Sequence, residues 1–171
     1  MTNPAEEILD VVDEHDNVTG QATRAEIHAN GLKHRAVHVF LFNAAGEIYI
    51  HRRSANKDRH PRLLDSSAAG HLDSGETYDN AAVRELSEEL HVHTKVEQVL
   101  KVEASDVTDQ EHVILYRALS DEHSLPEPDP AEIEWGTFVA PDRLTNRMEE
   151  HPEDFVPAFI YLWKEYQKIT T

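Results

Sequence analysis

Apolar and polar residues alternate through much of the first half of the chain, a pattern that predicts β-strands. In the run HRAVHVFLF, residues Val37, Val39 and Leu41 fall on one face. A polar turn separates this run from a second one at 47–51. Nearer the N-terminus, two short extended runs flank a cluster of turn-forming residues at 13–17, as in a β-hairpin. We therefore expect four strands before the first long helix.

The periodicity changes to that of an α-helix between Thr77 and about Leu90. Ala82, Val83 and Leu86 share one side of this segment at helical spacing, together with Leu90. The side chain of Thr77 is suited to capping the first turn. The segment is therefore predicted to be a helix whose apolar side faces the core.

The second half of the chain predicts three more strands and two helices, interrupted by an acidic, proline-rich loop at 120–130. The strands are expected at 96–102, 113–117 and 133–140, and the helices at 142–147 and from Pro157 onward. Many strands with few helices, one of them central, indicate an α/β (α+β) sandwich with a mixed β-sheet. The length of 171 residues fits one domain spanning 1–171, with about 1–30 as an N-terminal hairpin extension.

The composition limits the classes of partner. The chain carries 33 Asp and Glu against 16 Lys and Arg, a net charge of −17, which repels nucleic acid and anionic membranes and helps to recruit divalent cations. It has no cysteine, so disulfides, thiolate metal sites and a thiol nucleophile are excluded. Without a membrane-spanning apolar stretch or a signal-peptide pattern, a cytoplasmic protein is expected. The charge alone equally fits a protein that needs only solubility or tolerance of salt.

Three glutamates lie close together on the predicted helix. Because positions three and four apart are neighbours on an α-helix, Glu85, Glu88 and Glu89 project from one side of it. Like charges at this spacing repel each other by about a few tenths of a kcal/mol per pair. One interpretation is a solvated face made of good helix formers. The other is a bound cation, because hard cations such as Mg²⁺ take carboxylate oxygens as ligands.

The turn before the helix favours the cation. Gly70 and Gly75 allow a tight turn in which a backbone carbonyl near Ala69 points at the carboxylates. Arg84 follows Glu76 by eight residues, a separation that a loop-to-helix fold closes into an ion pair bracing the turn. The sequence therefore predicts a metal site where the turn meets the helix.

The stretch GHLDSGETYDNAAVRELSEELHV resembles the signature of the Nudix superfamily, G-x5-E-x7-R-E-U-x-E-E-x-G-U, in which U is a large aliphatic residue. The matching positions are Gly70, Glu76, Arg84, Glu85, Leu86, Glu88, Glu89 and Val92. Only the second glycine differs, since His91 stands in its place. Glycine at the end of a helix often takes a positive φ, so His91 puts the geometry of that end in question.

The resemblance implies a Nudix-type α/β/α sandwich and a divalent-metal-dependent attack of water on a diphosphate, with Mg²⁺ or Mn²⁺ as cofactor. It also implies that Glu85, Glu88 and Glu89 bind the metal, and that one of them, or a carboxylate elsewhere, serves as base. We assign Glu85, Glu88 and Arg84 as the catalytic residues.

A basic segment, HRRSANKDRHPR at 51–62, stands out in this acidic chain. We predict Arg53 and Lys57 as substrate contacts, because a diphosphate needs local positive charge. Arg52 is expected to point the opposite way along its strand. A solvated loop at a strand end is the alternative interpretation.

The region from Gly31 to His71 also resembles isopentenyl-diphosphate isomerases and the Nudix hydrolases nearest to them. This resemblance implies a further metal site of histidines and a carboxylate, with the ligands His28, His34, His71 and Glu111, and Asp109 as an additional option. Each histidine alone equally fits a surface or hydrogen-bonded residue. The isomerases carry a catalytic cysteine immediately before the glycine that matches Gly70, whereas this chain has Ala69.

The favoured function is therefore hydrolysis of a diphosphate bond in a small nucleoside diphosphate derivative. The glutamate helix is nearly complete, and the methyl group of Ala69 cannot carry a proton to or from carbon. A catalytically silent Nudix domain that binds a nucleotide or a protein is one alternative, and an isomerase-like enzyme is a weaker one. No nucleic-acid or membrane partner is expected, a homodimer is left open, and the exact diphosphate is not indicated.

Overall fold

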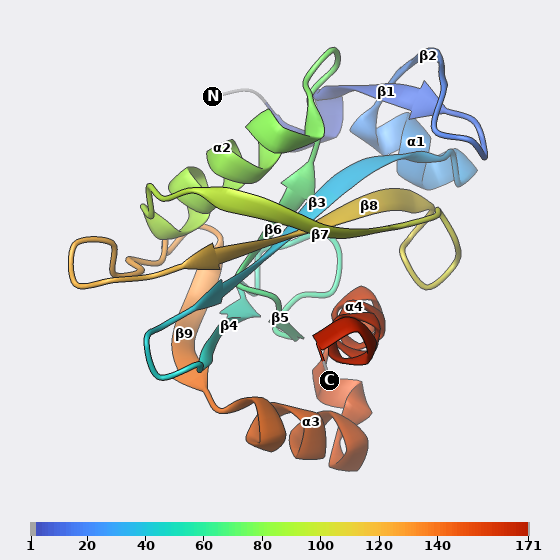
Figure 1. Ribbon diagram of the computed structural model, residues 1–171. Coiled ribbons are helices and arrows are strands. Elements are labelled where there is room, and N and C mark those ends of the chain that lie inside the picture. The colour runs from blue at the N-terminus through green and yellow to red at the C-terminus, as the bar shows by residue number, and fades with distance from the viewer. Residues whose placement is uncertain (1–2, 171) are drawn as a thin grey trace.

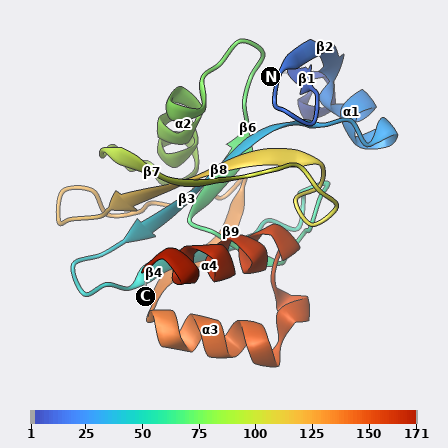
Figure 2. The same ribbon diagram turned by 45° about the vertical axis from the view of Figure 1, so that its right-hand side comes forward.

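A computed structural model describes residues 3–170 of the chain. Its elements, with η for a short 3₁₀-helix, are η1 (Pro4–Glu6), β1 (Ile8–Val12), β2 (Val18–Thr23), α1 (Arg24–Asn30), β3 (His34–Phe42), β4 (Ile48–Arg53), β5 (Leu64–Asp65), β6 (Ala68–His71), α2 (Tyr78–Leu90), β7 (Val96–Val102), β8 (Glu111–Leu119), β9 (Ile133–Val139), α3 (Pro141–Glu150), η2 (Pro152–Asp154) and α4 (Pro157–Thr170). Figures 1 and 2 show α2 on one side of a twisted sheet and α3 and α4 on the other. The predicted sandwich of helices around a mixed sheet is confirmed.

The larger sheet combines parallel and antiparallel strands. Its order is β5-β4-β3-β8-β7, with β6 paired to β3 and β9 paired to β4. Strand β3 runs parallel to β8, with His34 opposite Glu111, and antiparallel to β6, with Ala36 opposite His71. The central strand β3 therefore brings together residues that are far apart in the sequence.

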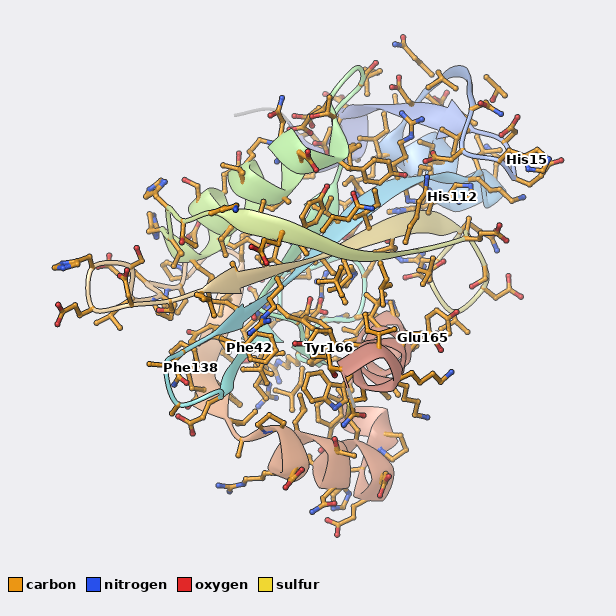
Figure 3. All side chains as sticks on the ribbon, in the orientation of Figure 1. His15, Phe42, His112, Phe138, Glu165 and Tyr166 are labelled. Carbon is orange, nitrogen blue, oxygen red and sulfur yellow. The ribbon has the colours of Figure 1, made fainter. Side chains whose placement is uncertain are left out.

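The two faces of β3 contribute to two separate parts of the core. Val37 and Val39 pack on the side of α2, as the alternation predicts. Phe42 packs on the opposite side, where its ring stacks on Tyr166 of α4 with ring centroids 5.7 Å apart. Figure 3 shows these two rings between the sheet and α4. Burial of such large aromatic side chains fixes α4 to the sheet.

The predicted hairpin of β1 and β2 is confirmed, but the helix that follows it was not predicted. The Thr23 hydroxyl accepts a hydrogen bond from the backbone N–H of Glu26 at 3.2 Å, and the Glu26 carboxylate accepts one from the N–H of Thr23 at 2.8 Å. This reciprocal capping box begins α1, and Gly31 ends it with a φ of 60°. The Thr-x-x-Glu spacing was the signal that the sequence analysis missed.

The hairpin is tied to the turn that precedes α2. The Asp10 carboxylate accepts hydrogen bonds from the Ser74 hydroxyl at 2.8 Å and from the backbone N–H of Gly75 at 3.0 Å. The Asp16 carboxylate accepts a further one from the Tyr78 hydroxyl at 2.8 Å. The N-terminal segment therefore supports the start of the glutamate-bearing helix.

The remaining differences concern the ends of elements. The short strands β5 and β6 were not predicted as separate elements, and α3 is longer than the helix predicted at 142–147. Strand β8 begins at Glu111, two residues before the predicted strand, so this carboxylate lies in the sheet. Among residues 3–170, none of the helices combines the length and the apolar character needed to cross a membrane.

Candidate active site

Helix α2 places its glutamates against strand β6. Its first turn is capped by the Thr77 hydroxyl, which accepts a hydrogen bond from the N–H of Asn80 at 3.2 Å. Leu86 and Leu90 are buried against the sheet. Glu85 and Glu89 are also buried on this helix. Burial of two carboxylates on the core-facing side of a helix is costly unless a partner compensates for it.

Glycine at position 70 makes room for one of these carboxylates. A Cβ atom added to Gly70 would lie 2.1 Å from Oε1 of Glu85, far inside van der Waals contact. The neighbouring Ala69 donates its backbone N–H to Oε1 of Glu89 at 3.4 Å. The first glycine of the motif therefore leaves room for the close approach of a carboxylate, which an added Cβ would displace, and strand β6 forms one wall of the site.

The surroundings of the two buried glutamates favour a proton or a cation between them. Burial raises the pKa of the Glu85 carboxyl to about 7, against the pull of the Arg84 charge. Burial and the negative charge of Glu85 raise the pKa of Glu89 well above its usual range. Like charges this close are stable only when a positive charge is shared between them.

Arg84 braces the turn as predicted. Its Nε and Nη2 atoms donate to the two carboxylate oxygens of Glu76 at 2.8 and 2.9 Å, and Nη2 also donates to the carbonyl of His71 at 2.9 Å. Nη1 reaches Glu85 at 2.8 Å and Glu88 at 3.2 Å. These contacts raise the pKa of Arg84 above its usual value and fix the guanidinium between turn and helix. Its catalytic assignment stays a prediction.

Glu88 differs from the other two glutamates of the helix. The side chain of Glu88 is 60% exposed and lies on the outer edge, where it pairs with Arg84. Because Arg84 donates two hydrogen bonds to Glu76, its positive charge does not neutralise both buried carboxylates. Glu85 and Glu89 thus offer hard oxygen ligands whose negative charge Arg84 balances only in part, which suits one divalent cation. The donor set fits the predicted metal.

His91 takes over the role of the motif glycine without disrupting the helix. It adopts a left-handed conformation with φ 54° and ψ 30°, and its backbone N–H donates to the carbonyl of Ser87 at 2.9 Å. Its Nδ1 forms a 2.7 Å hydrogen bond with the carbonyl of Glu127. This contact, from the loop between β8 and β9, helps to stabilise a conformation that a non-glycine residue adopts at a modest cost.

The basic segment approaches the same site. The guanidinium of Arg53 donates to the buried Asp65 carboxylate at 3.0 Å and to the carbonyl of Arg59 at 3.2 and 3.0 Å. Lys57 forms an ion pair with Glu132. Arg52 turns away to Glu134, 3.3 Å from its carboxylate, as strand alternation predicts. Neither Asp65 nor Glu132 was predicted, because nothing in their local sequence indicates these distant partners.

A second group of ligating side chains includes His71, which directly follows Gly70 on β6. His28 of α1, His34 of β3 and His71 of β6 each place a ring nitrogen within 4.8 Å of the others. Glu111 lies beside them, with its Oε1 2.9 Å from Nε2 of His71 and 3.4 Å from Nε2 of His34. The structure thus brings together all four side chains implied by the isomerase resemblance, and it places Glu111 with the histidines rather than with the α2 glutamates.

The chemistry of this histidine cluster also fits a divalent cation. Nε2 of His34 is buried and, within the described residues, does not meet hydrogen-bond geometry with any partner. Burial, followed by the charge of His71, lowers the pKa of His28 to about 4, so the imidazole is neutral, as a metal ligand must be. Asp109, the additional option, instead contacts Arg59 at 2.6 Å and His60 at 2.8 Å.

Comparisons with known proteins agree with this geometry. The model of the NUDIX domain family matches residues 32–159. A protein named an uncharacterized Nudix hydrolase in Streptomyces coelicolor is 46% identical over 53% of this chain and 50% of its own length. The chain thus spans about half the length of this relative and of a second one.

Two further matches cover most of both chains. A Nocardia farcinica protein named isopentenyl-diphosphate Delta-isomerase is 31% identical over 87% of this chain and 88% of its own. The crystal structure of a Deinococcus radiodurans protein matches with a TM-score of 0.75 and 33% identity, over 84% of this chain and 90% of the other. Sheet, glutamate helix and preceding turn together define a fold of the Nudix type. The chain belongs to the Nudix family.

Proposed function

We propose that the protein is a divalent-cation-dependent hydrolase that cleaves a diphosphate bond in a small nucleoside diphosphate derivative. The observation that carries this proposal is the buried pair Glu85 and Glu89 against Gly70, beside a basic segment. A buried pair of carboxylates is costly, and a bound divalent cation gives it a use.

Each part of the site has a role in this proposal. Glu85 and Glu89, with Glu88 at the edge, would hold Mg²⁺ or Mn²⁺. When bound, this cation would neutralise the diphosphate oxygens and lower the pKa of a water molecule. Arg84 keeps Glu85 in place, and the ammonium group of Lys57 forms an ionic contact with a phosphoryl group of the substrate. Water oxygen forms a bond to phosphorus and gives its proton to a carboxylate of the site, Glu85 or Glu88. The bond from phosphorus to the bridging oxygen breaks, and its electron pair leaves with that oxygen, so two phosphate-containing products form.

An isomerase is the second candidate, favoured by the histidine cluster with Glu111 and by the relative from Nocardia farcinica. Ala69 stands where the isomerases carry their cysteine, and the chain has no cysteine at all. Proton transfer to carbon therefore lacks its expected acid, and hydrolysis is favoured. A homodimer and a cytoplasmic location stay predictions from the sequence.

The test is a panel of nucleoside diphosphates, sugar nucleotides and isopentenyl diphosphate, incubated with Mg²⁺ or Mn²⁺ and followed by phosphorus NMR. We expect metal-dependent cleavage of at least one nucleoside diphosphate derivative and no isomerisation of isopentenyl diphosphate. Tight binding without turnover would identify a catalytically silent binding domain. Isomerisation of isopentenyl diphosphate would show that the protein is an isomerase and not a hydrolase. The matched inactive control is a Glu85→Gln, Glu89→Gln double variant.

A further inference from the structure

The two predicted substrate cations differ in how firmly they are held. Arg53 makes three hydrogen bonds, and its carboxylate partner Asp65 is only 3% exposed. The pair of Lys57 and Glu132 lies at the surface of the site instead, with side chains 22% and 41% exposed. A ligand can therefore separate Lys57 from Glu132 in water, whereas separating Arg53 from Asp65 leaves a buried charge unpaired.

The backbone of Glu132 is fixed, although its side chain can be displaced. Its N–H donates to the carbonyl of Asp129 at 3.0 Å, and its carbonyl accepts from the N–H of Ser54 at 2.9 Å. Asp129 in turn donates its N–H to the carbonyl of Glu89 at 2.8 Å. This turn thus ties Glu132 both to the basic segment and to the end of α2.

Backbone hydrogen bonds place Lys57 and Glu132 beside the end of α2 that carries Glu89. Glu132 is linked to Glu89 through Asp129, and the backbone N–H of Lys57 donates to the carbonyl of Ser54 at 3.2 Å, next to Glu132. A diphosphate with one phosphoryl group at the glutamates therefore has Lys57 as the nearby cation for its second group, and Glu132 already occupies that cation.

We propose that Glu132 is a tethered counter-ion that a diphosphate displaces from Lys57 and that recovers Lys57 once the diphosphate is cleaved. This inference rests on the proposed function. Glu132 is then a specificity-determining residue. It favours ligands that are held both at the α2 glutamates and at Lys57, and it favours release of the phosphate product.

The physical basis is a difference in tethering. A diphosphate held at the glutamates presents its second phosphoryl group to Lys57 at a high effective concentration, so it competes well with the tethered Glu132 carboxylate. After cleavage the two phosphate groups are no longer linked. A free phosphate at Lys57 then competes against a carboxylate that is still attached to the protein, and it is displaced.

The experiment compares the native protein with Glu132→Gln by calorimetry in Mg²⁺, using inorganic phosphate and the non-hydrolysable methylenediphosphonate as ligands. An exposed ion pair contributes on the order of 0.2–1 kcal/mol, so removing the competing charge should tighten phosphate binding roughly 1.4- to 5-fold. Binding of methylenediphosphonate should tighten by a smaller factor than binding of phosphate. When the protein turns over the substrate found by the panel, phosphate should inhibit Glu132→Gln more strongly than the native protein, by a similar factor. The rate of the chemical step should not fall.

Two variants serve as controls. Glu134→Gln removes the neighbouring carboxylate, which pairs with Arg52 and faces away from the site, and it should leave both affinities unchanged. In a Lys57→Gln background, Glu132→Gln should no longer tighten phosphate binding, because the cation for which Glu132 competes is gone.

Unchanged or weaker phosphate binding by Glu132→Gln would overturn the inference. So would a fall in kcat of about 100-fold with unchanged affinities, because that result would make Glu132 a proton acceptor instead. If the native protein binds no methylenediphosphonate in Mg²⁺ and cleaves no diphosphate, the proposed function itself fails and this inference falls with it.

Discussion

Strand β6 serves two candidate cation sites that differ in their donors. Gly70 and Ala69 face the buried carboxylates of α2. The next residue, His71, joins two further histidines and Glu111. The first site offers hard oxygen ligands with an excess of negative charge, whereas the second offers imidazole nitrogens with a single carboxylate. The comparison teaches that one strand can present sites suited to different cations.

The two sites also differ in what holds them together. The glutamates come from a single helix and depend on one neighbouring turn. The histidine cluster needs α1, β3, β6 and β8 to be in place at once. We therefore expect substitutions at the first site to affect catalysis and substitutions at the second to affect the binding of softer metals.

Removal of a buried glutamate should have the largest effect. Glu85→Gln or Glu89→Gln keeps the shape of the side chain but removes one of the charges that hold the metal, so kcat/KM should fall by at least about 100-fold. The control is Glu97→Gln, which alters only an exposed pair with Lys95. Activity within about twofold of the native protein in both buried variants would remove these residues from the mechanism.

Gly70→Ala should lower activity much more than it lowers the stability of the fold. The added Cβ forces the end of the Glu85 side chain to move, and because that end is flexible, the free energy of unfolding should fall by only about 1 kcal/mol. A misplaced ligand should lower kcat/KM by about 10-fold or more. Gly20→Ala is the matched control, since its Cβ meets nothing within 4 Å. Equal activities of the two variants would show that the close approach at Gly70 is unimportant.

The histidine cluster is tested by His34→Gln. Loss of one imidazole should weaken binding of Zn²⁺ at this cluster by about 10-fold or more, while Mg²⁺-dependent turnover changes less than in the glutamate variants. Binding is measured by competition with a chelator dye, with the exposed His123→Gln as control. If His34→Gln abolishes Mg²⁺-dependent turnover and leaves Zn²⁺ binding intact, the assignment of different cations to the two sites is wrong.

The last expected effect is on stability without metal and leaves activity aside. Because the pKa of Glu85 is raised from 4.5 to about 7 in the folded state, its stabilising contribution is present below about pH 4.5 and is lost as the pH rises toward 7. Relative to Glu85→Gln, the native protein in chelator should lose roughly 1–3 kcal/mol of unfolding free energy between about pH 5 and pH 8. Urea unfolding measures this difference, and a difference independent of pH would contradict the raised pKa.

The geometry of the glutamate helix could be predicted because its parts lie in one turn and one helix. Spacing placed Glu85, Glu88 and Glu89 on one side of the helix and paired Arg84 with Glu76. The structure has this ion pair and buries Glu85 and Glu89, whereas Glu88 lies at the exposed edge. The partners of the basic segment could not be predicted in this way. Glu132 lies 75 residues from Lys57, and only the pairing of β9 with β4 brings them together.

Fold-level expectations followed the same rule. Long periodic segments such as α2 and β3 were predicted, whereas α1 was missed because seven residues are too few to show helical periodicity. As a result, His28 could be connected with His34 and His71 only through a resemblance. Their convergence in space depends on how α1 packs, which no local pattern encodes.

The most direct test of the central claim is calorimetric titration of the native protein with Mg²⁺ in buffers of different ionisation enthalpy. A cation that replaces the proton shared by Glu85 and Glu89 should bind with release of about one proton near pH 7, and its affinity should rise with pH. The Glu85→Gln, Glu89→Gln double variant should lose this binding. Absence of saturable Mg²⁺ binding, or equal binding by the double variant, would contradict the claim that these buried carboxylates hold the cation.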